Sequence, residues 1–168
     1  MRMVVRAAVP VQAPADVVFG YVTDWPRQRE WIPLTHVRLV PGPHGEDRAR
    51  HVGGRFRAWT GIGPVGFWDP ITVTAWEEQP DGSGRCDILH TGRVVRGDAQ
   101  FRVVARGPDA CTAMLWERLE VPGGPVGALL WRLVGRALGP ALDRGAEVVL
   151  RRMARRAEQL PRAGSSGA

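Results

Sequence analysis

The chain of 168 residues contains no lysine, so all 23 of its basic residues are arginines. Without a side-chain amine of that kind, a covalent mechanism through a lysine Schiff base is excluded. Serine is nearly absent as well, because Ser83, Ser165 and Ser166 are the only ones and the last two stand in the final residues of the chain. A catalytic triad built on serine is therefore not expected.

Cysteine is scarce, and long apolar runs are missing. Cys86 and Cys111 share no metal-ligand spacing and fall on predicted core strands, so we expect buried, reduced thiols and neither a metal nor a cofactor. No run approaches the roughly 20 apolar residues of a membrane span. The segment from Met1 to Val11 carries Arg2 and Arg6 without a long apolar stretch, which argues against a signal peptide and for a cytoplasmic protein.

Positive charge is concentrated near the C-terminus. The chain has a formal net charge of +6, and the segment 132–162 holds eight arginines against Asp143, Glu147 and Glu158, which leaves 8 − 3 = +5 there. Solvated arginines on the outer side of an amphipathic helix explain this best. An acidic protein partner or an anionic membrane surface is the alternative, and nucleic acid is not expected.

Glycine and proline separate short hydrophobic segments, and no linker divides the chain, so we predict one domain over 1–160 and a disordered tail over 161–168. An opening strand at 4–11 is followed by a short helix that starts near Pro14, and Pro26 precedes a second helical turn. The later segments have the spacing of antiparallel hairpins. Strands are predicted at 36–40, 54–61, 67–77, 84–91, 99–105 and 111–121.

One helical tract runs from about Gly124 to Leu160. Its two halves are each amphipathic, but their apolar stripes point in different directions, and Gly139-Pro140 lies between them. Because proline removes a backbone donor and crowds the preceding turn, we expect a kink or short break there. The first stripe comprises Leu129, Leu130, Leu133, Val134, Ala137 and Leu138; the second comprises Leu142, Ala146, Val149, Leu150, Met153, Ala157 and Leu160.

This order of elements, together with several short motifs, resembles the START/Bet v1-like (SRPBCC) superfamily, and within it the polyketide cyclase/dehydrase and lipid-transport branch. The resemblance covers about 3–160. It implies an α+β helix-grip fold, in which a curved antiparallel sheet of about seven strands wraps around a long C-terminal helix, with two short helices between strands 1 and 2. The residues that carry the resemblance are Val11-x-Ala13-Pro14-Ala15-Asp16-x-Val18-Phe19, Val22-x-Asp24, Trp31, Gly53-Gly54-x-Phe56, Gly97-x-x-x-Phe101, Thr112-x-Met114-x-Trp116 and Gly124-x-Val126-Gly127.

Such a fold implies a cavity between the concave face of the sheet and the long helix. Aromatic and aliphatic side chains on the predicted strands and on the first half of the helix would suit a lipid-like or polycyclic guest. Each of them has an alternative role as a plain core residue, and Trp25 and Trp31 are expected to pin the small helices to the sheet. The predicted ligand-binding residues are Phe56, Trp59, Trp68, Ile88, Phe101, Met114, Trp116, Leu130 and Leu133.

Three residues are candidates for proton transfer. His90 shares a strand face with Cys86 and Ile88, so its imidazole could act on a ligand from inside an apolar cavity. Glu117 and Glu120 point to opposite faces, and Arg118, on the face of Glu120, could hold a ligand carboxylate or phenolate. A satisfied core histidine and a rim ion pair are the structural alternatives, and Asp69 is a further candidate acid that could equally cap a bend.

Three functions remain open from the sequence. The first is binding of a hydrophobic small molecule, either lipid-like or resembling an aromatic polyketide, by a monomer or homodimer. The second is a non-covalent polyketide cyclase or dehydratase that uses the same cavity, in which orientation of a reactive chain would supply much of the acceleration. The third is a module that binds a protein or a membrane through the basic C-terminal helix.

Overall fold

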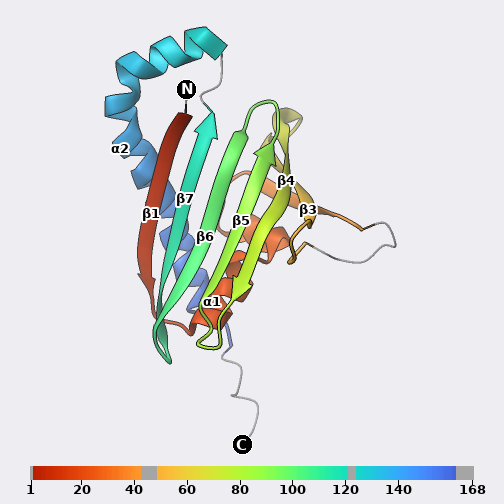
Figure 1. Cartoon of the computed structure of the whole chain (residues 1–168), viewed down its shortest axis with the longest axis vertical. Helices are drawn as coiled ribbons and strands as arrows, with labels where there is room; N and C mark the ends of the chain where they lie inside the picture. The colour runs from red at the N-terminus through yellow and green to blue at the C-terminus, as the bar shows by residue number, and fades with distance from the viewer. Residues whose placement is uncertain (1, 43–48, 121–123, 162–168) are drawn as a thin grey trace, which may run out of the picture.

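A computed structural model describes residues 2–42, 49–120 and 124–161, without the side chains of 124–131 and 133–137. One α-helix and a 3-10 helix follow the first strand, as the sequence predicts, and the last element is a long helix (Figure 1). In chain order the elements are β1 (Arg2–Val11), α1 (Ala15–Val22), η1 (Trp25–Glu30), β2 (Thr35–Val40), β3 (Arg55–Ile62), β4 (Val65–Glu78), β5 (Gly84–Thr91), β6 (Arg96–Gly107), β7 (Ala110–Glu120) and α2 (Gly124–Ala157).

The seven strands form one antiparallel sheet in the order β1-β7-β6-β5-β4-β3-β2. Strands β2 to β7 follow one another as hairpins, and β1 closes the sheet at the far edge by pairing with β7. This is the predicted helix-grip architecture, and each predicted strand is present with shifts of three residues or fewer at its ends. Val121, the predicted end of the last strand, lies outside the described residues.

Alternation along the strands gives the sheet one covered face and one open face. On β1 every second residue from Val5 to Val11 is buried and those between them are exposed, and β5 repeats this pattern from Gly84 to His90. The buried set faces α1, η1 and the second half of α2, and we call it the inner face. Because the side-chain period of a strand is two, the neighbouring residues necessarily belong to the outer face.

Two tryptophans from η1 and its end cover part of the inner face. Trp25 stacks on Phe56 with a ring-centroid distance of 4.4 Å, and Trp31 meets Phe101 edge-on at 6.4 Å. Both indoles are about 1% exposed, and Trp25 Nε1 donates a hydrogen bond of 2.6 Å to the carbonyl of Ala49. The tryptophans thus pin the short helices to the sheet, as the sequence predicts.

Of the predicted kink or short break at Gly139-Pro140, the break is absent, because helix α2 is continuous through Pro140. The helix nevertheless changes direction part-way along its length, as a kink would produce (Figure 1). In its second half Leu150, Met153 and Ala157 are buried, which confirms most of the second apolar stripe, whereas Leu142 is 38% exposed. The side chains of the first stripe, apart from exposed Leu138, lie outside the described residues. The arginines of the last turns face solvent as expected: Arg144, Arg151, Arg152, Arg155 and Arg156.

Carboxylates of α2 and of the residue that follows it protect the free edge of β1. Asp143 Oδ1 accepts a hydrogen bond of 2.8 Å from the backbone N–H of Arg6, and Glu158 Oε1 accepts one of 2.9 Å from that of Gln12. Pro10, between these two positions on the same edge, has no N–H to satisfy. An edge strand with unpaired donors is a template for association with other chains, so the helix also closes the sheet against its neighbours.

Both cysteines are buried free thiols, as predicted, and burial raises the pKa of Cys86 to about 12 and that of Cys111 to about 11. Neither thiol is therefore a ready nucleophile. Among the helices in the part of the chain that the structure describes, none has the length and apolar character needed to cross a membrane.

Substitution of Gly97 tests the register of β6 against β7. It has φ of +143°, and a Cβ added there would lie 2.1 Å from the carbonyl oxygen of Arg118 on β7. We expect Gly97→Ala to lower the free energy of unfolding by about 1–3 kcal/mol, because both the backbone and the β6–β7 pairing would have to shift. Urea denaturation followed by circular dichroism measures this.

Gly145→Ala in α2 is the matched control. A Cβ at Gly145 meets nothing within 4 Å, and alanine favours a helix, so this variant should be unchanged or more stable by up to about 1 kcal/mol. Equal stability of the two variants would contradict the register of β6 against β7.

Candidate functional site

The inner face carries a buried pair of polar side chains from two neighbouring strands. Asp69 begins the buried part of β4 and His90 lies near the end of β5, and Asp69 Oδ2 is 2.6 Å from His90 Nδ1. The two residues are 5% and 8% exposed. Since a carboxylate can only accept, His90 Nδ1 carries the proton of this hydrogen bond, and in the neutral ring Nε2 then holds a lone pair.

Three buried side-chain polar atoms have no hydrogen-bond partner among the described residues. They are Asp69 Oδ1, His90 Nε2 and Trp31 Nε1. A buried polar atom without a partner costs about 1–3 kcal/mol, so native proteins rarely retain several of them without a functional reason. Asp69 Oδ1 and His90 Nε2 belong to one hydrogen-bonded pair, and both are suited to accept a hydrogen bond from a ligand hydroxyl.

A third titratable group, Glu117 on β7, belongs to the same face. Burial is the main cause that raises its pKa, Asp69 adds to the effect and His90 opposes it. The electrostatic influence of both residues shows that the three groups lie close enough to interact. A raised pKa favours the protonated carboxyl, which can donate a proton, whereas the Nδ1-protonated ring of His90 accepts one at Nε2.

Only small residues of β6 stand between His90 and Glu117. His90 pairs with Gly97, and Glu117 pairs with Ala99 across the next pair of strands. Neighbouring strands are about 4.8 Å apart, so the strands of His90 and Glu117 are separated by roughly 10 Å. On the inner face of β6, Gly97 and Ala99 therefore present only a hydrogen atom and a methyl group. The next residue of β6 on that face is Phe101, which has a large ring.

Three of the predicted ligand-binding residues lie on the inner face. Phe56, Ile88 and Phe101 are between 1% and 5% exposed. The two phenylalanines contact the η1 tryptophans, so at this end of the sheet indole rings occupy the concave space. Leu130 and Leu133, predicted on the helix opposite, have side chains outside the described residues.

The other predicted ligand-binding residues are on the outer face, and their assignment to a cavity under the helix is wrong. Trp59 and Trp68 pair across β3 and β4 with ring centroids 5.4 Å apart. They lie on the same face of the sheet as the exposed Arg38 and Arg57. Strand alternation explains the error, because Phe56 and Ala58 are buried and Trp59 must therefore turn outward.

Strand alternation also places Met114, Trp116 and Arg118 on the outer face. Cys111, Ala113 and Leu115 are the buried residues of β7, so the even-numbered positions point outward. Arg118 is exposed, donates from Nε to Asp98 Oδ1 at 2.9 Å and lies over the Trp116 ring. The rim ion pair is thus the correct alternative for Arg118, and of the predicted catalytic residues only His90 and Glu117 share a face.

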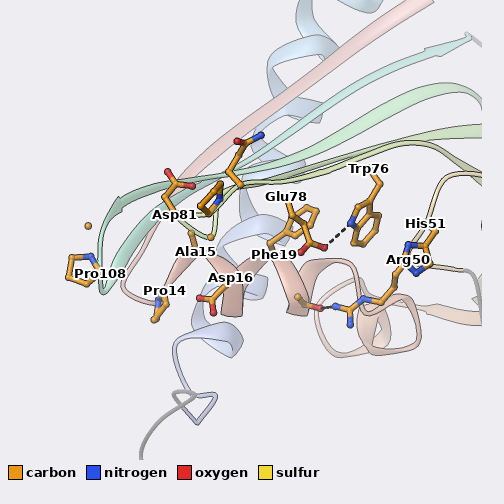
Figure 2. Close-up of a pocket in the computed structure, with 15 residues that line it drawn as sticks. Pro14, Ala15, Asp16, Phe19, Arg50, His51, Trp76, Glu78, Asp81 and Pro108 are labelled. Atoms are coloured by element: carbon orange, nitrogen blue, oxygen red, sulfur yellow. Dashed lines mark hydrogen bonds between the residues drawn. The ribbon is translucent and has the colours of Figure 1, made fainter.

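A separate surface cleft of about 740 Å³ lies at the other end of the sheet, between α1 and the end of β4 (Figure 2). Several of its polar side chains are already engaged: Trp76 Nε1 donates to Glu78 Oε1 at 2.8 Å, and Arg50 Nη2 donates to the carbonyl of Gly20 at 2.6 Å. Trp76 also packs on Phe19 at 5.2 Å. The cleft contains none of the three groups of the inner-face cluster.

The pairing of Asp69 with His90 is the feature that the sequence interpretation missed. Asp69 is recognisable as a candidate acid, but its partner depends on the register of the β4–β5 hairpin, in which Ile71 faces His90. That register contains an irregularity between Val73 and Ala75, which alternation of apolar residues does not reveal.

The fold and this inner-face cluster define the class of protein: it is a ligand-binding helix-grip domain. The chain belongs to the family described as polyketide cyclase / dehydrase and lipid transport, whose model matches residues 2–158. No curated protein matches it.

Solved structures support the same fold. A START superfamily protein from Mycobacterium smegmatis is 20% identical, with 94% of this chain and 99% of that chain covered and a TM-score of 0.64. The Zhui aromatase/cyclase from Streptomyces sp. R1128 is 18% identical over 98% and 99% of the two chains, with a TM-score of 0.59. Norcoclaurine synthase from Thalictrum flavum, in complex with dopamine and hydroxybenzaldehyde, is 14% identical over 96% and 90%, with a TM-score of 0.57.

The raised pKa of Glu117 predicts how stability depends on pH. The folded state holds a proton on Glu117 that the unfolded chain releases above its ordinary pKa of 4.5, so this residue's contribution to stability decreases as pH rises from there through the folded-state pKa. We expect Glu117→Gln to remove that decrease. Its free energy of unfolding, relative to the unmodified protein, should therefore increase as the pH rises above 4.5, as urea denaturation at a series of pH values would measure.

Glu120→Gln, on the exposed end of the same strand, is the control and should leave the pH profile unchanged. A stability difference between Glu117→Gln and the unmodified protein that stays constant with pH would show that Glu117 is not protonated preferentially in the folded state.

Proposed function

We propose that the protein binds a hydrophobic, oxygen-bearing small molecule of the aromatic polyketide kind against the inner face, and that His90 transfers a proton to or from it. The observation that carries the proposal is the buried His90 ring, which is fixed at Nδ1 by Asp69 and whose Nε2 has no hydrogen-bond partner among the described residues. The enzymatic alternative from the sequence is therefore preferred to a carrier without chemistry.

The Asp69–His90 pair has the arrangement expected of a general base. The carboxylate orients the ring, selects the Nδ1-protonated tautomer and stabilises the imidazolium that forms when Nε2 accepts a proton from a ligand C–H or O–H group. Burial excludes water, which would otherwise compete for Nε2. A core histidine with a purely structural role would be expected to have both nitrogens satisfied.

Glu117 complements His90 as a general acid. Two titratable groups whose surroundings favour opposite protonation states can divide the work of one reaction. In a cyclisation followed by loss of water, His90 would remove a proton from carbon, and protonated Glu117 would donate one to the departing or carbonyl oxygen. The strands of His90 and Glu117 are roughly 10 Å apart. Gly97 and Ala99 of β6, which lie between them, have small side chains.

The apolar surroundings and the comparisons support the ligand class. Ile88 shares the inner face of β5 with His90, and the aromatic residues of the core lie next to this row. The family description names polyketide cyclases, dehydrases and lipid transport, and one similar fold is that of an aromatase/cyclase. An aromatic ligand would find flat apolar contacts and a few polar groups to fix its orientation.

A pair of probes that differ by one hydroxyl tests the proposal. The affinities of 2-naphthol and naphthalene for the unmodified protein and for His90→Leu would be measured by displacement of a hydrophobic fluorescent dye. One hydrogen bond contributes about 0.5–1.5 kcal/mol, so replacement of His90 should reduce the preference for 2-naphthol over naphthalene by about 2- to 12-fold. Asp69→Asn should reduce it as well, because the amide can stabilise the wrong tautomer.

His36→Leu is the matched control, since His36 is exposed on the outer face, and it should leave both affinities unchanged. If His90→Leu binds both probes saturably and with the same preference as the unmodified protein, proton transfer by His90 is refuted and the protein is a carrier. Absence of saturable dye binding to the unmodified protein would contradict the ligand site itself. Melting temperatures of all variants establish that they are folded.

A further inference from the structure

The outer-face tryptophans lie three residues behind the end of the β3–β4 hairpin, whose last paired residues have the parity of the inner face. The β3–β4 hairpin ends in Ile62 and Val65, which pair with each other and are 70% and 77% exposed. Leu34, 55% exposed, is adjacent to them, because its carbonyl accepts a hydrogen bond of 3.0 Å from the N–H of Gly61. We call Leu34, Ile62 and Val65 the apolar tip. Three large aliphatic side chains exposed together are unusual on a soluble surface.

Behind the apolar tip lies a band of aromatic and cationic side chains. Trp59 and Trp68 face each other, and the guanidinium carbons of Arg38 and Arg57 lie 5.4 Å and 5.1 Å from the Trp68 ring centroid. We call these four residues the Trp–Arg band. All are on the outer face, where no described element covers the sheet, and the two arginines are exposed.

The spacing of these layers follows from the strand rise of about 3.3 Å per residue. Trp59 lies three residues from Ile62, or about 10 Å from the apolar tip, and Arg57 lies about 7 Å further on. The guanidinium groups of Arg38 and Arg57 reach back to the Trp68 ring, so the aliphatic side chains stand at the end and the indoles and guanidinium groups lie together behind them. A bilayer presents its acyl chains and then its headgroup region in the same order.

Charge around this surface has one sign. Between Trp31 and Gly42, and again from Ala49 to Trp76, the only acidic residue is Asp69, which is buried on the inner face with His90. The exposed charges of these two segments are therefore arginines. The described part of this surface is attracted to anionic lipid headgroups and has no exposed carboxylate that they would repel. Glu46 and Asp47, between the two segments, lie outside the described residues.

We infer that the protein docks on anionic membranes through the β3–β4 hairpin, with the apolar tip inserted and the Trp–Arg band at the headgroups. The partner is a bilayer containing anionic phospholipid. The hairpin lies at the same end of the sheet as the inner-face cluster, because Ile71 of β4 pairs with His90 about 20 Å from Val65 (Figure 1). Docking would thus bring the ligand site near a reservoir of hydrophobic molecules.

Vesicle co-sedimentation tests this inference. Vesicles of phosphatidylcholine with about 25% phosphatidylglycerol should bind the protein at low salt, and vesicles of phosphatidylcholine alone should bind it much more weakly. Arg38→Gln with Arg57→Gln should weaken binding about fivefold for each arginine replaced. Ile62→Ser with Val65→Ser should weaken binding further at high salt, where the apolar contribution remains.

Arg152→Gln with Arg155→Gln is the matched control, because it removes the same charge from exposed positions on α2 and should leave the affinity within about twofold. In the unmodified protein, acyl-brominated phosphatidylglycerol should quench tryptophan emission. The variant Trp59→Phe with Trp68→Phe should lose most of that quenching while still binding.

Three results would overturn the inference: no binding to anionic vesicles at low salt, binding lost in the α2 variant but kept in the hairpin variants, or binding of a single-stranded oligonucleotide in place of vesicles. Circular dichroism of each variant shows whether it is folded. The naphthol affinities are measured without lipid, so loss of membrane docking and loss of the proposed proton transfer are separately detectable.

Discussion

The two-residue side-chain period of an antiparallel sheet with one covered face is the constraint on which this structure depends. Each strand must present its buried residues at alternate positions, so the register of the hairpins determines which functional groups meet. Asp69, His90 and Glu117 come from three strands and reach one face, whereas Arg118, next to Glu117, is directed away. A shift of one residue in any of these pairings would move the inner-face residues of that strand to the outer face, and the outer-face residues to the inner face.

This sorting gives the sheet two chemically different faces. The inner face combines apolar packing with a buried polar pair, two of whose atoms have no hydrogen-bond partner in the part of the chain that the structure describes, an arrangement that stability alone would disfavour. The outer face of β2, β3 and β4 carries half-buried tryptophans and exposed arginines, and a closed core could not accommodate the arginines. Helix α2 and the residue that follows it support both by closing the β1 edge with Asp143 and Glu158.

Much of the fold could be predicted from the sequence, because turn residues and alternation reveal strand positions directly. The number of strands, the two short helices after the first strand and the role of Trp25 and Trp31 all follow from such local signals. The continuity of helix α2 at Pro140 does not follow from local signals, because tertiary contacts of α2 with β1 outweigh the local cost of proline. The family model and the solved structures agree with the fold that the local patterns indicate.

The candidate site was only partly predictable, for a physical reason. Alternation correctly separated Glu117 from Arg118, but hydrophobicity alone assigned Trp59, Trp68, Met114 and Trp116 to the interior. A tryptophan is compatible with either face, and only the pairing of its strand decides between them. The bond between Asp69 and His90 needs the β4–β5 register, which an irregularity in the strand hides from a sequence pattern.

The tautomer of His90 is the most direct test of the central claim. Long-range proton–nitrogen NMR correlation should show a neutral ring protonated at Nδ1 and hydrogen-bonded to Asp69, with the Nε2 resonance shifting when 2-naphthol binds. A ring protonated at Nε2, or an Nε2 resonance unaffected by a saturating aromatic ligand, would contradict the claim.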